Sequence, residues 1–245
     1  MNQKVTIAPD IQPYRSFVYR KLQAAGAHFQ YCREATIAAG YAAADIEQQR
    51  LQRLALADLS PLPRLGFKGR GVPDWLAARG VTVPSAANSA IPDSQYGLVA
   101  RLGYNELLLL GETADQGGRI NALAGTWQAA ATERPAPANL LPRAHSHASF
   151  GIYGAFADRM FAKLCGVDLQ PAVFANHAVA LTSVARVAAI IIRHDHGGIL
   201  AYRLLIESGY APYMLDCLTD AMSEFDGGFI GFDILQDTAG MTKPV

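Results

Sequence analysis

The feature that most constrains this chain is an internal repeat. Gly66-Phe67-Lys68-Gly69 and Gly151-Ile152-Tyr153-Gly154 are two G-x-x-G stretches, 85 residues apart. Each is followed by a helix-forming segment that ends in Gly-Val, at Gly80 and at Gly166. Because a repeat at a fixed spacing decides the architecture before any single motif is interpreted, the sequence predicts one fold built from two related halves.

The expected elements come in the same order in both halves. In the first half we expect a strand over 62–68, a helix over 73–80, a loop over 84–94, strands over 97–102 and 106–110, and a helix over 119–131. In the second half we expect a strand over 149–153, a helix over 157–164, strands over 184–193 and 199–206, a helix over 213–222 and a strand over 229–235. This order is that of the split β-α-β unit, so the predicted fold class is α+β with two tandem ferredoxin-like halves.

The predicted boundaries follow from the same pattern. Residues 1–57 form an N-terminal extension with helices over 15–23 and 42–56. The first half covers 58–132, a linker covers 133–140, the second half covers 141–236, and 237–245 form a tail. The linker is the segment richest in Pro and Ala between two periodic regions, which is typical of a connection rather than an element.

Composition excludes several classes of protein. The formal net charge is zero and the Lys and Arg residues are scattered, so the chain lacks the basic patch of a nucleic-acid-binding protein. Charged residues make up 17% of the chain, against roughly 25% in an average soluble domain, which suits a subunit that buries part of its surface. No apolar run is long enough for a membrane helix, and the three cysteines are isolated; both observations predict a cytoplasmic protein.

The sequence shows no complete catalytic or metal-binding constellation. The G-x-x-G stretches lack the pattern that arranges backbone amides around a phosphate, so we interpret their glycines as backbone devices. An H-x-H pair on a strand places two imidazoles on one face, but neither His145 with His147 nor His194 with His196 has an identifiable third ligand, so no metal is predicted. Asp168 is interpreted as the cap of the loop that follows it, with a role in a site as the alternative.

Two groups of motifs resemble a known family. The first runs from Ser16-Phe17-Val18-Tyr19 through 22–29 to Leu54–Ser60, ahead of Phe67-Lys68-Gly69. It resembles the opening of the glycine cleavage T-protein-like, tetrahydrofolate-associated superfamily. The second comprises Gly154, Leu164–Leu169, the apolar strand over 184–192 and Tyr202–Ser208. It is similar to the gamma subunit of heterotetrameric sarcosine oxidase, and the resemblance implies the same duplicated ferredoxin-like architecture.

The departures from the T-protein pattern concern the residues that carry its chemistry. The acidic G-G-x-x-D-D stretch of the family corresponds to Ala90–Tyr96, where Asp93 is the single carboxylate and the glycines are missing. The folate-holding T-G-E-x-G-[FYW]-E segment has no counterpart around Ile199–Glu207. No catalytic residue is therefore transferred from the family to this chain.

The resemblance leads to three hypotheses. The first is a non-catalytic gamma-type accessory subunit of a flavin- and folate-dependent sarcosine (N-methyl amino acid) oxidase or dehydrogenase, in which a larger flavoprotein and folate-binding subunit holds the flavin and NAD. The second is a stand-alone tetrahydrofolate-binding aminomethyl or methyl transferase, with Asp93, Asp168, Tyr202 and Glu207 as candidate folate contacts. The third is a scaffold of the same superfamily that has lost both its ligand and its original partner.

Overall fold

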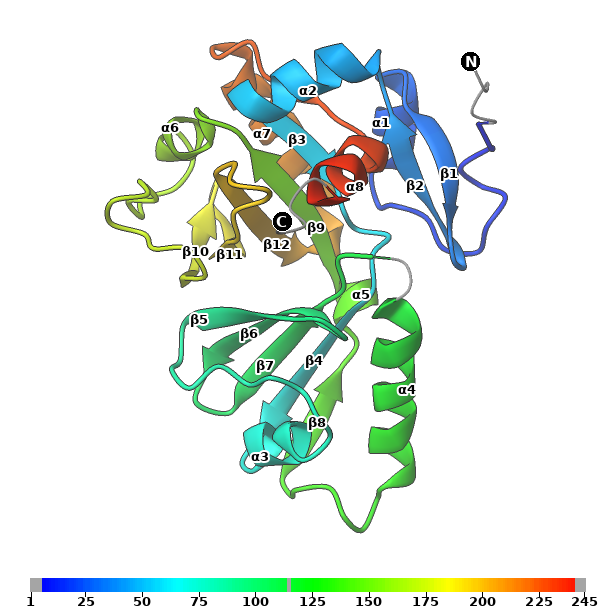
Figure 1. Cartoon of the computed structure of the whole chain (residues 1–245), viewed down its shortest axis with the longest axis vertical. Helices are drawn as coiled ribbons and strands as arrows, with labels where there is room; N and C mark the ends of the chain where they lie inside the picture. Colours follow the sequence, from blue (N-terminus) through cyan, green and yellow to red (C-terminus); the bar gives the residue numbers. More distant parts are fainter. Residues whose placement is uncertain (1–5, 114–115, 241–245) are drawn as a thin grey trace. The chain divides into compact units, whose positions relative to one another are not determined.

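The structure is a computed structural model that describes residues 6–113 and 116–240 (Figure 1). The chain forms two compact units. Unit 1 combines residues up to Pro61 with Ala148–Asn176 and the segment from Thr182 onward, and unit 2 comprises Leu62–His147 and His177–Leu181. The fold class is mixed α+β, as predicted. The N-terminal segment, which the sequence set apart as an extension, is grouped with most of the second half.

Unit 2 contains a five-stranded antiparallel sheet. Its strand order is β5 (Ser89–Asp93), β6 (Gly97–Gly103), β7 (Glu106–Leu110), β4 (Arg64–Gly69) and β8 (Ala138–Leu141). Helices α3 (Val72–Ala77) and α4 (Gln116–Ala129) pack on one face of this sheet, and the short helix α5 (Arg143–Ser146) follows β8. The core of the unit is aromatic: Trp127 lies edge-on to both Trp75 and Phe67, with ring centroids 4.8 and 5.1 Å apart. These rings join the two helices to strand β4.

Unit 1 contains a separate hairpin and a six-stranded sheet, apart from His147 and residues 179–181 of that sheet, which are assigned to unit 2. The sheet has the order β10 (Val179–Val184), β11 (Val187–Arg193), β12 (Ala201–Glu207), β9 (His147–Tyr153), β3 (Ala55–Asp58) and β13 (Gly228–Phe229). The hairpin is β1 (His28–Cys32) with β2 (Ala35–Gly40). The helices are α1 (Tyr19–Ala24), α2 (Ala44–Arg53), α6 (Ala157–Ala162), α7 (Ala211–Ser223) and α8 (Phe232–Gly240), with a 3₁₀ turn over Ser208–Tyr210. Helix α8 packs against β2 (Figure 1).

The two sheets repeat the same arrangement of equivalent strands. The strand that carries each G-x-x-G lies beside the second strand of the hairpin in its own half, β4 beside β7 and β9 beside β12. The first strand of each hairpin, β6 or β11, lies one position further out, and β5 or β10 closes that edge. On the other side of the repeated strand, β8 flanks β4, whereas β3 from the N-terminal segment flanks β9.

The second glycine of each G-x-x-G occupies the same structural position. Gly69 and Gly154 have φ values of +149° and +106°, which L-residues rarely adopt. A Cβ atom on Gly69 would lie 2.4 Å from Ala138 Cα, and one on Gly154 would lie 2.5 Å from the carbonyl of Arg53. Each N–H donates to the turn of the neighbouring hairpin, to Asn105 O at 2.8 Å and to Leu200 O at 2.9 Å. Both glycines are therefore required by close backbone approach, which supports the structural interpretation of the motif.

Several predicted elements differ from the observed ones in the N-terminal part. The predicted helix over 42–56 ends at Arg53, because 55–58 form β3 and are buried between β9 and β13. Tertiary burial overrides helix propensity here. The predicted loop over 84–94 contains β5, and the predicted linker overlaps β8 at 138–140.

The C-terminal part contains two further corrections. The apolar run over 184–193 is interrupted by a turn at Ala185 and Arg186, both with positive φ, so that two strands replace one. The predicted strand over 229–235 is a strand at Gly228–Phe229 only, and α8 begins at Phe232. A short apolar run does not distinguish a strand from a buried helix, which explains this error. The part of the predicted tail beyond 240 lies outside the described residues. None of the helices within 6–113 and 116–240 has the length and apolar character of a membrane span.

Candidate functional site

Asp93 has a structural role in unit 2, where its carboxylate binds backbone N–H groups. It lies at the end of β5 with 7% of its surface exposed. Its Oδ2 accepts the N–H of Thr82 at 2.8 Å, and its Oδ1 accepts those of Gln95 and Tyr96 at 2.8 and 3.1 Å. Burial acts to raise the pKa of this carboxyl, but the hydrogen bonds outweigh it and the pKa is lowered. Asp93 is thus an ionised side chain that ties together two loops, with both oxygens occupied.

Tyr202 and Asp168 come close to one another in unit 1. Tyr202 is 1% exposed, donates its hydroxyl to Leu169 O, and packs against the rings of Phe161 and Phe174. Burial, and then the charge of Asp158, raise the pKa of Tyr202, which therefore stays a neutral donor. Asp168 is exposed, and its Oδ1 accepts the N–H of Gln170 at 3.0 Å, which is the loop-capping role predicted for it.

The four predicted contacts are divided between the two units. Glu207 is exposed at the end of β12 in unit 1, the unit that also holds Asp168 and Tyr202. Asp93 belongs to unit 2. The structure therefore brings Tyr202 together with the loop that carries Asp168, and it gives Asp93 a structural task of its own.

A hollow of about 530 Å³ opens beside Asp168. It is lined by α6 and the loop that follows, including Asp158, Arg159, Cys165 and Asp168. The Oδ1 atom of Asp158 is buried and accepts no hydrogen bond within the described chain. Cys165 is buried, and its Sγ accepts the N–H of Val167 at 3.4 Å. The hollow offers carboxylates and one guanidinium to a small polar ligand, but it holds no nucleophile paired with a base.

Two arginines that the sequence analysis did not single out hold equivalent loops in the two halves. In unit 1, Arg193 Nη1 donates to Pro171 O and Phe174 O at 3.1 and 2.8 Å, while Nε and Nη2 bind Asp195 at 3.0 and 2.7 Å. The hydrogen bonding that Arg193 donates to Asp195 is the main cause that raises the pKa of Arg193.

The counterpart in unit 2 is Arg101. Its Nη1 donates to Pro84 O and Ser85 O, both at 3.0 Å, and its Nη2 donates to Tyr104 O at 2.8 Å. Arg101 and Arg193 each come from the first strand of a hairpin and bind the loop that follows Gly-Val. An arginine near the end of each matched apolar strand is the sequence signal that would have revealed them.

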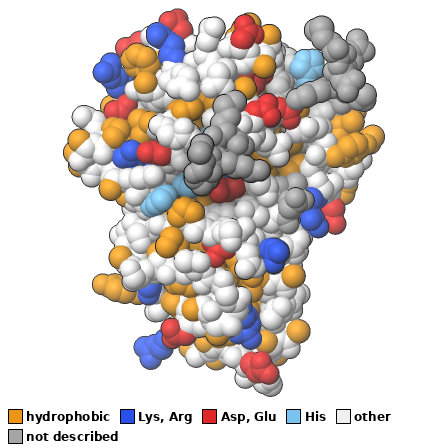
Figure 2. Space-filling view, in the orientation of Figure 1, with side chains coloured by type: hydrophobic (Ala, Val, Ile, Leu, Met, Phe, Trp, Pro, Cys, Tyr) orange, Lys and Arg blue, Asp and Glu red, His pale blue; other side chains and the backbone are white. Residues whose placement is uncertain are grey.

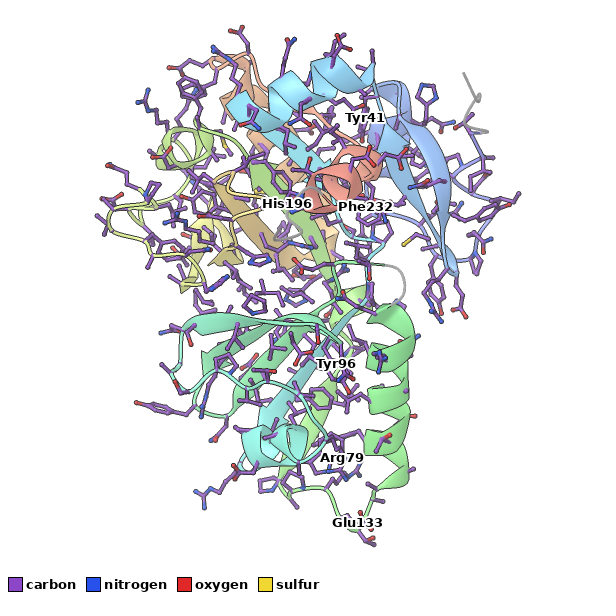
Figure 3. All side chains as sticks on the ribbon, viewed as in Figure 1. Tyr41, Arg79, Tyr96, Glu133, His196 and Phe232 are labelled. Carbon is purple, nitrogen blue, oxygen red and sulfur yellow. The ribbon has the colours of Figure 1, made fainter. Side chains whose placement is uncertain are left out.

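The H-x-H pairs do not form the geometry considered for a metal. His145 is exposed in α5 and His147 begins β9, so the two do not alternate along one strand. In the second pair, His196, which is labelled in Figure 3, has its Nε2 2.9 Å from Leu235 O. The His196 ring lies edge-on to the ring of Tyr153. Among residues 6–113 and 116–240, no group of three or more His, Cys, Asp or Glu side chains is arranged to hold a metal ion.

His147 has a serine partner, but its electrostatic surroundings make it a weak base. Its Nδ1 lies 2.9 Å from Ser146 Oγ, and its Nε2 lies 2.9 Å from Arg143 Nη1. Burial lowers the pKa of His147 to about 4, helped by the charges of Arg143 and Arg64 and opposed by Glu106. A serine nucleophile needs a base whose pKa lies near the working pH, and the lowered pKa of His147 makes it a poor base for Ser146.

Comparisons with known proteins give structural matches only. No family model matches the sequence, and no curated protein matches it. A chain of heterotetrameric sarcosine oxidase from Corynebacterium sp. U-96, solved in complex with pyrrole 2-carboxylate, matches with a TM-score of 0.60 and 24% identity over 75% of this chain and 93% of that chain. The glycine cleavage system aminomethyltransferase T from Bartonella henselae matches with a TM-score of 0.68 and 14% identity over 92% of this chain and 62% of that chain.

These matches confirm at the level of the fold the resemblance that the sequence motifs indicated. At these identities they are evidence of shared architecture. This protein therefore has a T-protein-like fold.

Proposed function

We propose that this chain is a non-catalytic gamma-type accessory subunit of a heteromeric flavin- and folate-dependent oxidase or dehydrogenase that acts on sarcosine or related N-methyl amino acids. One observation carries the proposal: the polar side chains best suited to chemistry are used within the fold. Asp93 binds three backbone N–H groups, Tyr202 binds Leu169 O, and the basicity of His147 is suppressed. A general base must be free and able to take a proton near the working pH.

The match to the sarcosine oxidase chain also supports an accessory subunit, because it extends over 93% of that chain and 75% of this one. This chain covers 62% of the aminomethyltransferase, which is less than two thirds of it. In this proposal the larger partner subunit holds the flavin, NAD and folate.

The surface of unit 1 offers apolar side chains for such a partner. Ile11, Tyr14, Phe17 and Tyr31 are exposed in the N-terminal segment and on β1. Figure 2 shows hydrophobic side chains interspersed with charged ones over the visible face. Exposed aromatic residues are enriched in the cores of protein interfaces.

Cys32, Cys165 and Cys217 are free thiols, which fits the reducing cytoplasm where we propose that the complex works.

The duplicated architecture is part of the same proposal. We propose that the two halves are ferredoxin-like units related by duplication. The matched pairs Gly69 with Gly154 and Arg101 with Arg193 support it, because each pair performs one structural task at equivalent places.

Affinity purification of the tagged chain from its native source tests the subunit proposal. A larger flavoprotein is expected to co-purify, to show flavin absorbance and to oxidise sarcosine or another N-methyl amino acid. The same chain expressed alone serves as the control and is expected to be colourless and inactive. An active, partner-free monomer from the native source would overturn the proposal.

A stand-alone tetrahydrofolate-binding aminomethyl or methyl transferase is the second candidate. The match to an aminomethyltransferase over 92% of this chain favours it, as does the hollow lined by Asp158 and Asp168. Carboxylates accept the paired N–H donors of a pterin ring. Calorimetric titration with tetrahydrofolate is expected to give binding that Asp168→Asn weakens if this candidate holds. No binding at millimolar ligand rules it out, and the absence of both folate and a partner leaves the scaffold hypothesis.

A further inference from the structure

Strand β8 forms an open edge of the sheet in unit 2. Among the described residues it pairs with β4 alone, whereas the opposite edge of the sheet is covered at Ser89, which forms a bridge with Ala178. Figure 1 shows β8 beside β4. The strand carries no charged side chain, although charged residues commonly protect edge strands. Such an edge can pair with an extended segment of another chain.

The sheet of unit 1 holds a further strand at the equivalent position. In the repeat, β8 on β4 corresponds to β3 on β9, and β13 lies on the far side of β3. Leu140 is opposite Phe67, the second residue of one G-x-x-G, and Leu56 is opposite Ile152, the second residue of the other. Leu140 and Leu56 are therefore equivalent. In the part of the chain that the structure describes, the sheet of unit 2 has no counterpart of β13.

The backbone groups of Leu140 are directed toward this open edge. The N–H of Gly69 donates to the turn between β6 and β7, on the side of β4 that faces away from β8. Because hydrogen-bonded and non-bonded pairs alternate along an antiparallel ladder, Lys68 bonds to β8, whereas Gly69 and Phe67 do not. Ala138 is opposite Gly69 and Leu140 is opposite Phe67. Both β8 residues therefore direct their N–H and C=O groups outward.

The equivalent outward groups in unit 1 bind β13. Leu54 O accepts the N–H of Gly228, and Leu56 O accepts that of Ile230, both at 3.1 Å. Phe229 lies between these two donors and beside Leu56, and β13 runs parallel to β3. Two carbonyls on the outer edge of β3 thus hold a parallel strand through its alternate N–H groups.

We propose that β8 binds an extended segment of the partner subunit, which runs parallel to β8 in the position that β13 has on β3. The segment donates two alternate N–H groups to Ala138 O and Leu140 O, and it accepts the N–H of Leu140. Leu140 is half-buried against the aromatic core of unit 2. The residue of the segment beside Leu140 lies on the same face, so we expect an apolar side chain there. Pro137 and Pro142 flank β8 and limit the contact to its four residues.

This proposal rests on the proposed function, because the segment comes from the partner subunit. A second copy of this chain fits the position less well. Two β8 strands related by a twofold axis would pair antiparallel, whereas β13 runs parallel to β3.

Hydrogen exchange of the backbone amides at residues 139–141 tests the proposal. It is measured in the isolated chain and in the complex purified from the native source. In the isolated chain we expect the Leu140 amide to exchange faster than those of Asn139 and Leu141, which bond to β4. In the complex we expect the exchange of Leu140 to slow by about tenfold or more, with smaller changes at Asn139 and Leu141.

A pair of variants at one position tests the same contact by co-purification. Leu140→Pro removes the outward N–H, and proline is tolerated on an edge strand where the N–H faces outward. We expect it to reduce the amount of co-purified flavoprotein by about tenfold. Leu140→Val keeps both the N–H and an apolar side chain, so it is the matched control and is expected to retain the partner. Thermal unfolding checks the fold of both variants, and if Leu140→Pro does not fold, the exchange of the wild type decides.

The proposal is overturned if the partner co-purifies but the Leu140 amide exchanges as fast in the complex as in the isolated chain, or if a folded Leu140→Pro retains as much partner as Leu140→Val. Either result leaves the proposed function intact. If no larger flavoprotein co-purifies with the wild type, both proposals fail. Protection of Leu140 in a dimer of the isolated chain would assign the edge to a second copy and would also overturn the proposal.

Discussion

Glu47 in α2 and Gly231, which are 184 residues apart in the sequence, are joined by a hydrogen bond of 2.7 Å from the Gly231 N–H to Glu47 Oε2. The other oxygen of the same carboxylate binds the N–H groups of Tyr41 and Ala42. One buried side chain thus connects the end of the β1–β2 hairpin, α2 and the entry to α8. Unit 1 depends on it for the placement of its last helix.

Replacement of Glu47 by alanine is expected to lower the free energy of unfolding by about 3 kcal/mol, because it leaves backbone N–H donors of unit 1 without their acceptor. Glu47→Gln keeps the size but replaces one acceptor by a donor, so about half of that loss is expected. Chemical denaturation measures both. Glu224→Ala is the control, since its exposed ion pair with Lys163 contributes less than about 1 kcal/mol. Equal stability of Glu47→Ala and Glu224→Ala would contradict the structural role of Glu47.

The equivalent glycines give a second test. A Cβ atom at position 69 or 154 would lie 2.4 or 2.5 Å from neighbouring backbone atoms, well inside van der Waals contact, and both residues have positive φ. Gly69→Ala and Gly154→Ala are each expected to cost more than about 2 kcal/mol. Gly166→Ala is the matched control, because a Cβ atom there meets nothing within 4 Å. Thermal or chemical unfolding distinguishes them, and near-wild-type stability of both test variants would refute the paired role.

Arg193 and Arg101 are expected to be irreplaceable by lysine. A lysine ammonium is a single point charge and does not reproduce the guanidinium fork, which bridges two carbonyls and a carboxylate at Arg193 and three carbonyls at Arg101. Arg193→Lys is expected to increase hydrogen exchange in the loop over 170–176, and Arg101→Lys in the loop over 82–88. Arg186→Lys, at the exposed turn before β11, is the control with no expected change. The idea fails if both loops keep the exchange rates of the wild type.

The lowered pKa of His147 predicts that the free energy of unfolding falls in mild acid. This pKa falls from the ordinary value of 6.5 to about 4 in the folded state, so the unfolded chain binds a proton first as the pH drops. The contribution of His147 to the free energy of unfolding is fully present above pH 6.5 and is lost as the pH falls toward about 4. After allowance for solvent screening, we expect the free energy of unfolding to fall by about 1–2 kcal/mol over this pH range.

The measurement is the free energy of unfolding at pH 7 and pH 5, compared among the wild type, His147→Gln and His145→Gln. The first variant is expected to reduce the pH dependence. The second is expected to keep it, because His145 is exposed. A pH dependence that His147→Gln leaves unchanged would assign the effect to other groups.

Features that depend on neighbours along the chain could be predicted from the sequence. The hairpin of β6 and β7 was predicted almost to the residue, because Gly103-Tyr104-Asn105 supplies the turn between two apolar runs. Helices α4 and α7 were predicted from local composition. Helix α4 begins three residues earlier and ends two residues earlier than predicted, and α7 begins two residues earlier and ends one residue later. The repeat of G-x-x-G and Gly-Val was also visible, because glycine marks positions where the backbone has no room for a side chain.

The neighbours of each segment in the folded protein depend on tertiary packing and could not be predicted in the same way. Residues 55–58 became β3 because β9 and β13 flank them, and the β1–β2 hairpin was not predicted at all. Asp93 is a candidate ligand contact in the sequence, but in the folded protein its carboxylate accepts three backbone N–H groups. The structural role of Glu47 could not be predicted from the sequence, because the Gly231 N–H that its carboxylate accepts lies 184 residues away in the chain. Hydrogen bonds and burial across such separations are set by packing, and a local pattern of residues carries no record of them.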